Sequence, residues 1–542
     1  MSHSVAPAKA GAQKSLSYSS PHPCPQDSSK TSSAAVLFPP SPPLGGEALR
    51  VSNPFMSLRL FQNLFRKKDI AAMLREVASE KSGLRRSLTA SNLVALGIGA
   101  IIGTGIFVIT GQAAAQYAGP ALTLSFVISA LGCVFAGLCY AEFAAMIPVS
   151  GSVYSYSYVT MGEFLAWFIG WDLILEYLFA CSAVAVGWSG YMQNLLLEWG
   201  MGLPPHLTQS TFQYTGGTWA LTGSLINFPA VCIVALITAL LLCGVRQSAW
   251  VNNAIVVVKV AVILLFIGFG LSYVDTSNWF PYIPENTGKF GEFGWSGILR
   301  GAAVVFFAYL GFDALSTAAQ ETRNPQKDMP KGILISLAIC ALLYVAVTAV
   351  LTGIVRYDEL NVDAPIALAI DRAGAGLAWM GPLIKLGALA GISSVILVMM
   401  MGQSRIYYAI SSDGLLPTLF SKISPRRGVP QNAILFSGIL TAAIAGLFPL
   451  NVLGELVSIG TLMAFSIVCI SIMVLRKTHP ELHRPFKVPL VWLIPSLGAF
   501  FCLVQMAALP WSTWFRLILW MLLGVAIYFA YGKRNSHLEK KS

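Results

Sequence analysis

Residues Gly97–Phe107 read GIGAIIGTGIF and lie inside an apolar run that extends from about residue 93 to residue 115. A run of this length predicts a helix that crosses a membrane. Four glycines, at positions 97, 99, 103 and 105, each weaken a helix by roughly 1 kcal/mol relative to alanine. We therefore expect the helix to break near mid-membrane, where bare peptide groups are tolerated only if they line a cavity or are buried in protein. The alternative is that Gly99 and Gly103 form a helix-packing motif.

The composition indicates a polytopic membrane protein. Hydrophobic residues make up 56% and charged residues 11% of the 542 residues, whereas an ordinary soluble domain has roughly 25% charged residues. The net charge of +11 would suggest nucleic acid in a soluble chain. Here the basic residues lie mostly in short loops, so we expect no nucleic-acid partner. The nine cysteines lie mostly within apolar runs without CxxC spacing, which predicts neither disulfides nor a metal site.

Apolar segments of near-spanning length recur along the chain. The predicted fold class is an all-α polytopic membrane protein with twelve transmembrane helices. The segments lie near residues 91–115, 120–146, 163–195, 226–245, 251–274, 295–317, 331–355, 379–402, 431–449, 453–475, 488–507 and 513–531. A further apolar stretch, Pro365–Ala375, is too short to cross and predicts a surface or re-entrant helix.

The ends of the chain differ from this pattern. Residues 1–55 are rich in Ser, Pro, Gly and Ala and are expected to be disordered; because Met56 begins a stretch typical of a cytosolic start, 1–55 is also a candidate mis-assigned extension. Residues 56–88 form a basic amphipathic segment that lies along an anionic membrane surface or is simply solvated. Lys and Arg gather in alternate loops and in the tail 532–542, which predicts that both termini are cytoplasmic.

A second interruption lies in the sixth segment, GAAVVFFAYLGFDALSTAAQETRNP, near Tyr309–Gly311. The first and sixth segments begin two groups of five, 89–274 and 291–475, which the segments of 488–531 follow. Corresponding breaks in two halves of a transporter indicate a substrate site at the membrane midplane. Half-helix N-termini offer N–H groups to an anion, and unwound carbonyls face a cation. An α-amino acid, which carries one carboxylate and one ammonium, suits such a site.

Lys259 lies in the apolar run VNNAIVVVKVAVILLFIGFG, seven residues beyond Asn252. At a rise of 1.5 Å per residue its backbone is about 10 Å inside the membrane end of the helix. A lysine at that depth is a functional candidate, although its long stem also permits snorkelling to the interface. If the side chain faces the helix bundle instead, burial favours the neutral amine and makes loss of its proton accessible.

Three long motifs resemble a known family. GAIIGTGIF, FFAYLGFDALSTAAQETRNPQKDMP and GQSRIYYAISSDGLLP are similar to the amino acid/polyamine/organocation (APC) superfamily and, more narrowly, to its bacterial cationic amino acid transporter (CAT) family. The resemblance spans roughly residues 65–531. It implies the five-plus-five inverted repeat of the sodium-coupled leucine transporters (LeuT-like), followed by two extra helices.

The resemblance also implies roles for particular residues. Thr104 and Gly105 would donate to the substrate carboxylate, and the carbonyls of Ile101, Phe307, Ala308 and Leu310 would receive its ammonium. Phe307 would also form part of the pocket wall or gate. The implied substrate-binding residues are Ile101, Gly103, Thr104, Gly105, Phe307, Ala308 and Leu310.

The resemblance further implies that Lys259 stands where sodium-coupled relatives of that family hold a sodium ion. Its ammonium would bridge the first helix near Gly99 and the eighth helix near Ser393 and Ser394. Protonation from outside would favour the outward-open state, and proton loss to the cytoplasm would favour substrate release.

Five further acidic residues have weaker interpretations. Asp313 follows a helix break and is interpreted as an N-cap, with recognition of a basic substrate side chain as the alternative. Asp172 and Glu176, spaced i, i+4, are expected at an interface or vestibule. Glu142 and Glu321 end apolar runs where Arg405 could pair with one of them, which predicts an inner gate or a solvated helix end.

Lys385, near the outer end of the eighth segment, is expected to snorkel. No phosphate-binding loop, GxSxG motif or histidine cluster with ligand spacing is present, so an enzyme is not predicted.

The predicted function is a secondary active amino acid permease, with proton-coupled symport of small neutral and/or cationic L-amino acids across the cytoplasmic membrane. Alternatives are an exchanger, a sodium-coupled carrier, and an amino acid sensor derived from a transporter. No cofactor or metal is expected, and the proton is the coupling ion. The expected partners are the amino acid and the lipid bilayer, while the oligomeric state is not predicted.

Overall fold

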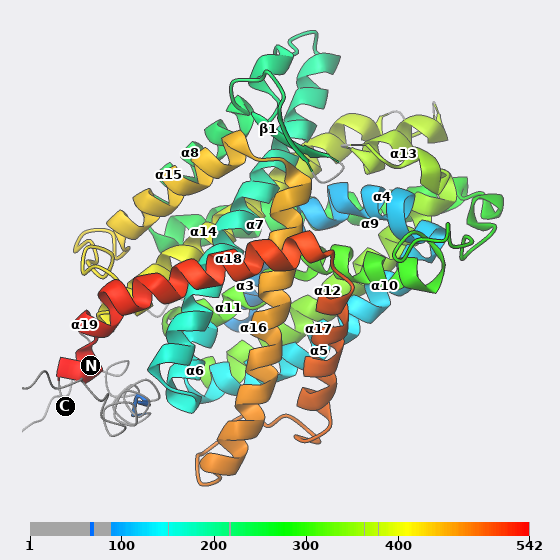
Figure 1. The fold of residues 1–542 in the computed structure, drawn as a ribbon. Helices are drawn as coiled ribbons and strands as arrows, with labels where there is room; N and C mark the ends of the chain where they lie inside the picture. The colour runs from blue at the N-terminus through cyan, green and yellow to red at the C-terminus, as the bar shows by residue number, and fades with distance from the viewer. Residues whose placement is uncertain are drawn as a thin grey trace, which may run out of the picture. The chain divides into compact units, whose positions relative to one another are not determined.

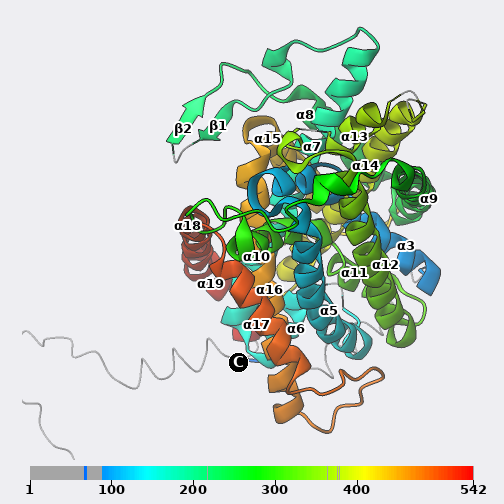
Figure 2. The same ribbon diagram turned by 90° about the vertical axis from the view of Figure 1, so that its right-hand side faces the viewer.

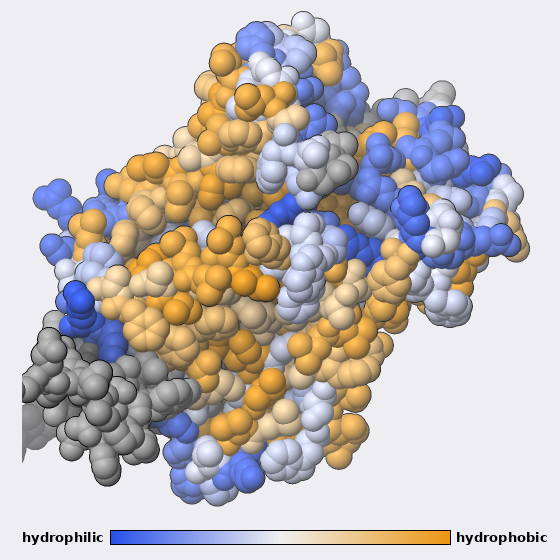
Figure 3. All heavy atoms as spheres, in the orientation of Figure 1, coloured by the Kyte–Doolittle hydropathy of each residue, from blue (hydrophilic) through white to orange (hydrophobic). Residues whose placement is uncertain are grey.

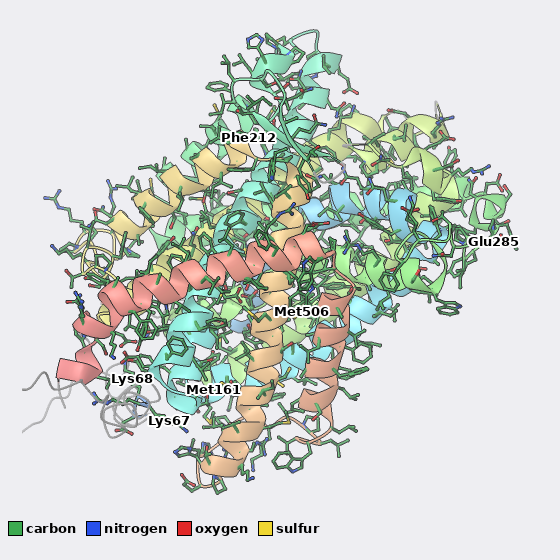
Figure 4. The ribbon with its side chains drawn as sticks, in the orientation of Figure 1. Lys67, Lys68, Met161, Phe212, Glu285 and Met506 are labelled. Atoms are coloured by element: carbon green, nitrogen blue, oxygen red, sulfur yellow. The ribbon has the colours of Figure 1, made fainter. Side chains whose placement is uncertain are left out.

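The computed structural model describes residues 66–69, 88–149, 151–215, 218–362, 364–374, 376–377 and 379–540. The expectations for residues 1–55 lie outside the described residues, as do those for most of residues 56–88. Within the latter segment, the Lys68 ammonium contacts the Asp413 carboxylate at 2.7 Å, and the Lys68 N–H donates to the Tyr158 carbonyl. Lys68 and Met161, labelled in Figure 4, lie at the end of the molecule that carries α6 (Ser152–Thr160) and α19 (Lys533–Asn535).

Each of the twelve expected segments coincides with helical structure. The helices of the membrane-spanning part are α3 (Ala90–Ile101), α4 (Thr110–Ala113), α5 (Leu122–Met146), α7 (Glu163–Glu198), α8 (Phe228–Cys243), α9 (Val245–Gly270), α10 (Gly294–Val305), α11 (Ala314–Thr317), α12 (Pro325–Ile354), α14 (Met380–Ser412), α15 (Gln431–Leu447), α16 (Leu450–Thr478), α17 (Ile494–Ala507) and α18 (Trp511–Ile527). The expected short helix is α13 (Pro365–Ala373), and α20 (His537–Lys540) ends the described chain.

Eight stretches of the described chain are long and apolar enough to cross a membrane, and three shorter apolar helices accompany them. The first stretch, Ala90–Met146, contains the first two expected segments. In Figure 3, apolar side chains form a broad band across the molecule and hydrophilic residues gather toward its two ends. The chain is therefore a multi-span helical membrane protein.

The core is formed by helices that are distant in sequence. α12 packs against α3 and α5, while α7 packs against α14 and α16. α3 also contacts α9 and α14. In Figure 1, α18 crosses α16, which runs through the front of the molecule. These contacts place the glycine-rich segment after α3 among other helices, where its irregular backbone is shielded from lipid.

A β-hairpin departs from the all-α expectation. Strand β1 (Phe212–Thr215) pairs antiparallel with β2 (Thr218–Leu221), with Phe212 opposite Leu221. Figure 2 shows the hairpin at one end of the helices, beside α8. Phe212 stacks on Phe448, with ring centroids 5.4 Å apart. The two strands flank Gly216 and Gly217, and a two-residue glycine loop between β-prone runs is a hairpin signal.

Candidate functional site

The first helix breaks within the glycine-rich stretch. α3 ends at Ile101, and Ile102 is extended with φ −76° and ψ 104°. A π-helical turn then begins at Gly105 and runs to Ile109. In this turn the N–H groups of Ile106 and Phe107 both donate to the Gly103 carbonyl at 3.2 Å, which leaves the N–H groups of Thr104 and Gly105 as the candidate donors to a ligand. This break lies where the sequence predicts it.

The sixth helix also breaks where the sequence predicts. α10 ends at Val305, and a 3-10 turn at Phe306–Tyr309 leads to Leu310, which is extended with ψ 145°. Gly311 has φ +107°, a conformation that glycine adopts freely and L-residues with side chains rarely adopt. α11 begins at Ala314. The α-helix is therefore interrupted over residues 306–313, where the carbonyls of Phe307, Gly311 and Phe312 accept from the N–H groups three residues further on.

The two breaks are in direct contact, and glycine makes that contact possible. A Cβ atom on Gly105 would lie 2.3 Å from the Cα atom of Ala308. A Cβ atom on Gly311 would lie 2.7 Å from the Cβ atom of Ala100. Two half-helix ends from distant parts of the chain thus share one site.

A small cavity lies between the breaks, with a volume of about 10 Å³. Six of the seven predicted substrate-binding residues line it: Ile101, Gly103, Thr104, Gly105, Phe307 and Leu310. The seventh, Ala308, lies against Gly105 instead. The other lining residues are Ala100, Ala180, Val184, Val395 and Met399. The walls are apolar apart from Thr104 and the backbone, and the volume is room for about one water molecule.

A much larger cavity, of about 580 Å³, opens toward the hairpin end and meets the small one at Phe307, which lines both. We call it the vestibule. Amide side chains are its main polar lining, from Gln112, Gln116, Gln209, Gln213, Asn227, Asn361 and Asn451. The ring of Phe307 is 5% exposed and therefore partitions the vestibule from the small cavity.

Tyr344, in α12, bridges the two breaks and was not predicted. Its hydroxyl lies 2.7 Å from the carbonyl oxygen of Ile101 and 2.8 Å from that of Ala308. Because one hydroxyl donates one proton, it satisfies one of these carbonyls at a time. Two of the carbonyls expected to receive the substrate ammonium therefore already share a donor.

Lys259, in α9, is fully buried and reaches the first break. Its Nζ donates to the carbonyl oxygens of Gly99 and Ile102, each at 2.9 Å, and to the Ser394 hydroxyl at 2.8 Å. An ammonium has three donors, and the structure supplies three acceptors. The side chain therefore faces the bundle and does not snorkel.

The structure separates the two candidate serines of α14. The Ser394 hydroxyl contacts both Nζ of Lys259 and the carbonyl of Gly99. The Ser393 hydroxyl instead donates to the Leu389 carbonyl of its own helix at 2.7 Å. Ser394 belongs to the lysine site, and Ser393 does not contact it.

The predicted inner gate contains one of the two candidate glutamates. Arg405, in α14, donates from Nε and Nη2 to one oxygen of Glu321 at 2.9 and 2.5 Å. Both side chains are at most 4% exposed. A solvated helix end does not fit this burial.

Glu142 lies elsewhere and does not pair with Arg405. Its carboxylate accepts from Arg476 at 2.8 and 2.7 Å and from the Val488 N–H at 2.7 Å. The Arg484 guanidinium lies 3.3 Å from it. Glu142 thus joins the end of α5 to the connection between α16 and α17.

Asp313 does not cap α11 with its side chain. Its carboxylate accepts from the Tyr177 hydroxyl at 2.5 Å and from the Gly311 N–H at 3.2 Å. Asp313 therefore stabilises the second break through hydrogen bonds to the break itself and to α7.

Asp172 and Glu176 are fully buried, and their carboxyl oxygens have no hydrogen-bond partner within the described chain. Neither lines the vestibule or the small cavity. Of the two expected positions, an interface or a vestibule, the structure places Asp172 at a helix interface, where a Cβ atom on Gly460 of α16 would lie 2.9 Å from its Oδ1. Lys385 is 5% exposed and pairs with Glu198, which ends α7 and has a side chain that is 47% exposed, so the buried stem of the lysine carries its ammonium to a helix end.

The site has the features of a membrane permease: two facing discontinuous helices, a vestibule on one side of them and a buried ion pair on another. The chain belongs to the amino acid permease family, whose model matches residues 88–527. It is thus a membrane transport protein of that family and not an enzyme.

Two relatives from Bacillus subtilis (strain 168) are similar over almost their whole length. The methylthioribose transporter is 46% identical over 478 residues, which is 88% of this chain and 100% of the relative. The branched-chain amino acid permease BcaP is 47% identical over 479 residues, 88% of this chain and 99% of the relative. Cationic amino acid transporter 4 of Homo sapiens is 37% identical over 420 residues, 77% of this chain and 63% of the relative. The transported solute of this chain is accordingly an amino acid or a related compound.

Proposed function

We propose that this chain is a proton-coupled symporter of small neutral L-amino acids with apolar side chains. It acts in the cytoplasmic membrane, with both termini cytoplasmic and the hairpin outside. Twelve spans form two inverted groups of five, α3–α9 and α10–α16, followed by α17 and α18. The facing breaks of the first helix in each group support this repeat.

The proposed substrate class rests on the residues that line the small cavity. Beyond the backbone groups of the breaks, it presents apolar side chains such as Val184, Val395 and Met399. No carboxylate lines it, so a cationic side chain would be buried there without a partner, which is costly. An aliphatic side chain would be stabilised by burial. The name of the relative BcaP agrees with this choice.

Alternating access follows from the two barriers. The vestibule gives access from the hairpin side up to Phe307. On the other side, the Glu321–Arg405 pair joins α14 to the chain just after α11. We infer that Phe307 moves to admit substrate and that the ion pair opens later to release it. Phe307 is 5% exposed and the two side chains of the ion pair are at most 4% exposed, so both barriers are closed in this structure.

Proton coupling is assigned to Lys259. Protonated, it holds the first break to α14 through Gly99, Ile102 and Ser394. Loss of the proton removes a donor and the charge, so the contact between α3 and α14 weakens. Because the Lys259 ammonium lies beside the first break, loss of its proton would also loosen the backbone that binds the substrate and so favour substrate release.

Uptake into proteoliposomes tests the proposal. We expect labelled valine, leucine and alanine to accumulate under an inward proton gradient, and arginine and lysine not to accumulate. Sodium-driven accumulation, or uptake only against preloaded amino acid, would instead support a sodium-coupled carrier or an exchanger. Saturable binding without accumulation would identify a sensor.

Methylthioribose is a second candidate substrate, because a relative of equal similarity is named as its transporter. The amide-lined vestibule suits a hydroxyl-rich solute, since amides both donate and accept hydrogen bonds. Competition between unlabelled methylthioribose and labelled leucine distinguishes the two candidates. If methylthioribose fully inhibits leucine uptake at a concentration close to that of the leucine, the thio-sugar is favoured as the substrate.

A further inference from the structure

An apolar groove runs between α7, α16 and α18 on the outside of the helix bundle. Its volume is about 550 Å³, and its lining includes Leu175, Phe179, Leu456, Leu519 and Leu523. Leu519 and Leu523 are at least half exposed. The groove shares no lining residue with the vestibule, although Glu455, which pairs with Arg516 of the groove, lines the vestibule. The transport mechanism above does not use the groove.

Arg516 is the charged residue of the groove lining. Its Nη1 is buried, lies 3.6 Å from Glu455 and has no hydrogen-bond partner within the described chain, whereas the side chain as a whole is 16% exposed. Its guanidinium also lies over the Tyr214 ring of the hairpin, 4.5 Å from the centroid.

The acceptors of Glu455 are already engaged by other donors. Arg300 donates to one carboxylate oxygen at 3.1 Å, and the Thr513 hydroxyl donates to the other at 2.7 Å. Two guanidiniums therefore share one carboxylate, and the cluster of Arg300, Arg516 and Glu455 carries a net charge of +1. In Figure 3, hydrophilic residues lie between the hairpin and α18, next to apolar side chains of α18.

The depth of Arg516 in the membrane matches a lipid headgroup. It is five residues after Trp511, so about 7.5 Å along α18. Trp511 is 77% exposed at the start of that helix, a position typical of the membrane interface. A charge at this depth in apolar surroundings is stabilised by a counter-charge.

We propose that this groove is a binding site for an anionic phospholipid, with the headgroup phosphate at Arg516 and an acyl chain along α18. Guanidinium and phosphate form strong charge-assisted hydrogen bonds, and an acyl chain complements the leucine-rich wall. A soluble phosphate would leave that wall uncovered, so a lipid is the occupant. The site goes beyond the proposed transport function and does not depend on the substrate.

Native mass spectrometry of the full chain in detergent tests the site, with added phosphatidylglycerol or phosphatidylcholine of the same acyl chains. We expect preferential retention of phosphatidylglycerol, by about fivefold, the ratio for roughly 1 kcal/mol per basic residue near a membrane surface. Arg516→Gln should reduce this preference to none, and Arg516→Lys should keep part of it. Leu523→Trp, which narrows the groove and keeps the charge, should weaken retention of both lipids.

Arg356→Gln is the matched control, because Arg356 is exposed and pairs with Asp358 outside the groove. It should retain phosphatidylglycerol like the wild type. Unchanged retention by Arg516→Gln, equal loss in Arg356→Gln, or displacement of the lipid by glycerol phosphate would overturn the proposal. A dimer peak that Leu523→Trp abolishes, without lipid adducts, would assign the groove to a second copy instead. Thermal unfolding of each variant without lipid identifies any that does not fold.

Discussion

Gly105 and Ala308 are in backbone contact: a Cβ atom on Gly105 would lie 2.3 Å from the Ala308 Cα atom. The two residues are about two hundred positions apart and belong to the two broken helices. Their contact brings the N-terminal turn that follows the first break beside the carbonyls of the second break. A solute with one negative and one positive end can therefore bridge them, which is the physical basis of the proposed amino acid site.

Gly105→Ala should disrupt this contact. The added methyl group meets backbone and cannot be accommodated by turning a side chain, so we expect a loss of about 1–3 kcal/mol in stability and strongly reduced uptake. Thermal unfolding and leucine uptake measure the two effects. Gly268→Ala is the control, because a Cβ atom there meets nothing within 4 Å. Equal uptake by the two variants would contradict the close contact.

Tyr344→Phe should lower the stability of the substrate-free protein. The variant leaves the buried carbonyls of Ile101 and Ala308 without their shared donor, and an unsatisfied buried acceptor costs about 1–3 kcal/mol. Thermal unfolding measures the loss, and added leucine should restore part of it, because its ammonium can bind the freed carbonyls. Tyr309→Phe is the comparison, because the Tyr309 hydroxyl donates to Phe126, outside the breaks. If Tyr309→Phe had a larger effect than Tyr344→Phe, the hydrogen bonds of Tyr344 to the two breaks would not be the cause.

Lys259→Ala should abolish uptake driven by a proton gradient. Wild-type uptake should rise as the outside pH falls, whereas the variant should show no such dependence. Ser394→Ala should lower uptake, because it removes one acceptor of Nζ, and Ser393→Ala should leave it unchanged, because that hydroxyl bonds within its own helix. Wild-type pH dependence in Lys259→Ala would remove the assigned role of the lysine.

Breaking the Glu321–Arg405 pair should destabilise the state in which it is closed. Removal of one partner from a buried pair costs about 3–5 kcal/mol, because the other charge stays buried alone. We therefore expect Arg405→Met to lower the unfolding temperature and the double variant Glu321→Gln/Arg405→Met to recover part of the loss. Glu359→Gln, which breaks a partly exposed pair with Arg372, should cost at most about 1 kcal/mol. If the double variant recovers none of the lost unfolding temperature, Glu321 and Arg405 do not stabilise each other.

The sequence predicted both helix breaks because glycine acts locally: it weakens the helix in which it lies. The importance of Lys259 was also predictable, since an ionisable side chain inside an apolar run must either face the helix bundle or reach the membrane interface. The hairpin could have been recognised from the two glycines between β-prone residues 212–215 and 218–221.

Other parts of the site depend on tertiary contacts and left no local signal. Tyr344 lies in an ordinary apolar helix, and its reach to both breaks follows from how α12 packs against α3 and α5. Ser393 and Ser394 are adjacent, so a turn of about 100° in an α-helix decides which one meets Lys259. The choice of Glu321 over Glu142 as partner of Arg405 likewise depends on the helix arrangement.

The position of Phe307 between the vestibule and the small cavity suggests how the protein could be inhibited. One aromatic ring stands between a roomy, amide-rich antechamber and a compartment that fits little more than water. A compound too bulky to pass that ring, with a polar scaffold matched to the amides, would plug the entrance while leaving the inner compartment empty. Such a blocker would act from the hairpin side alone, and its potency would be set by the amide residues of the entrance and not by those of the inner compartment.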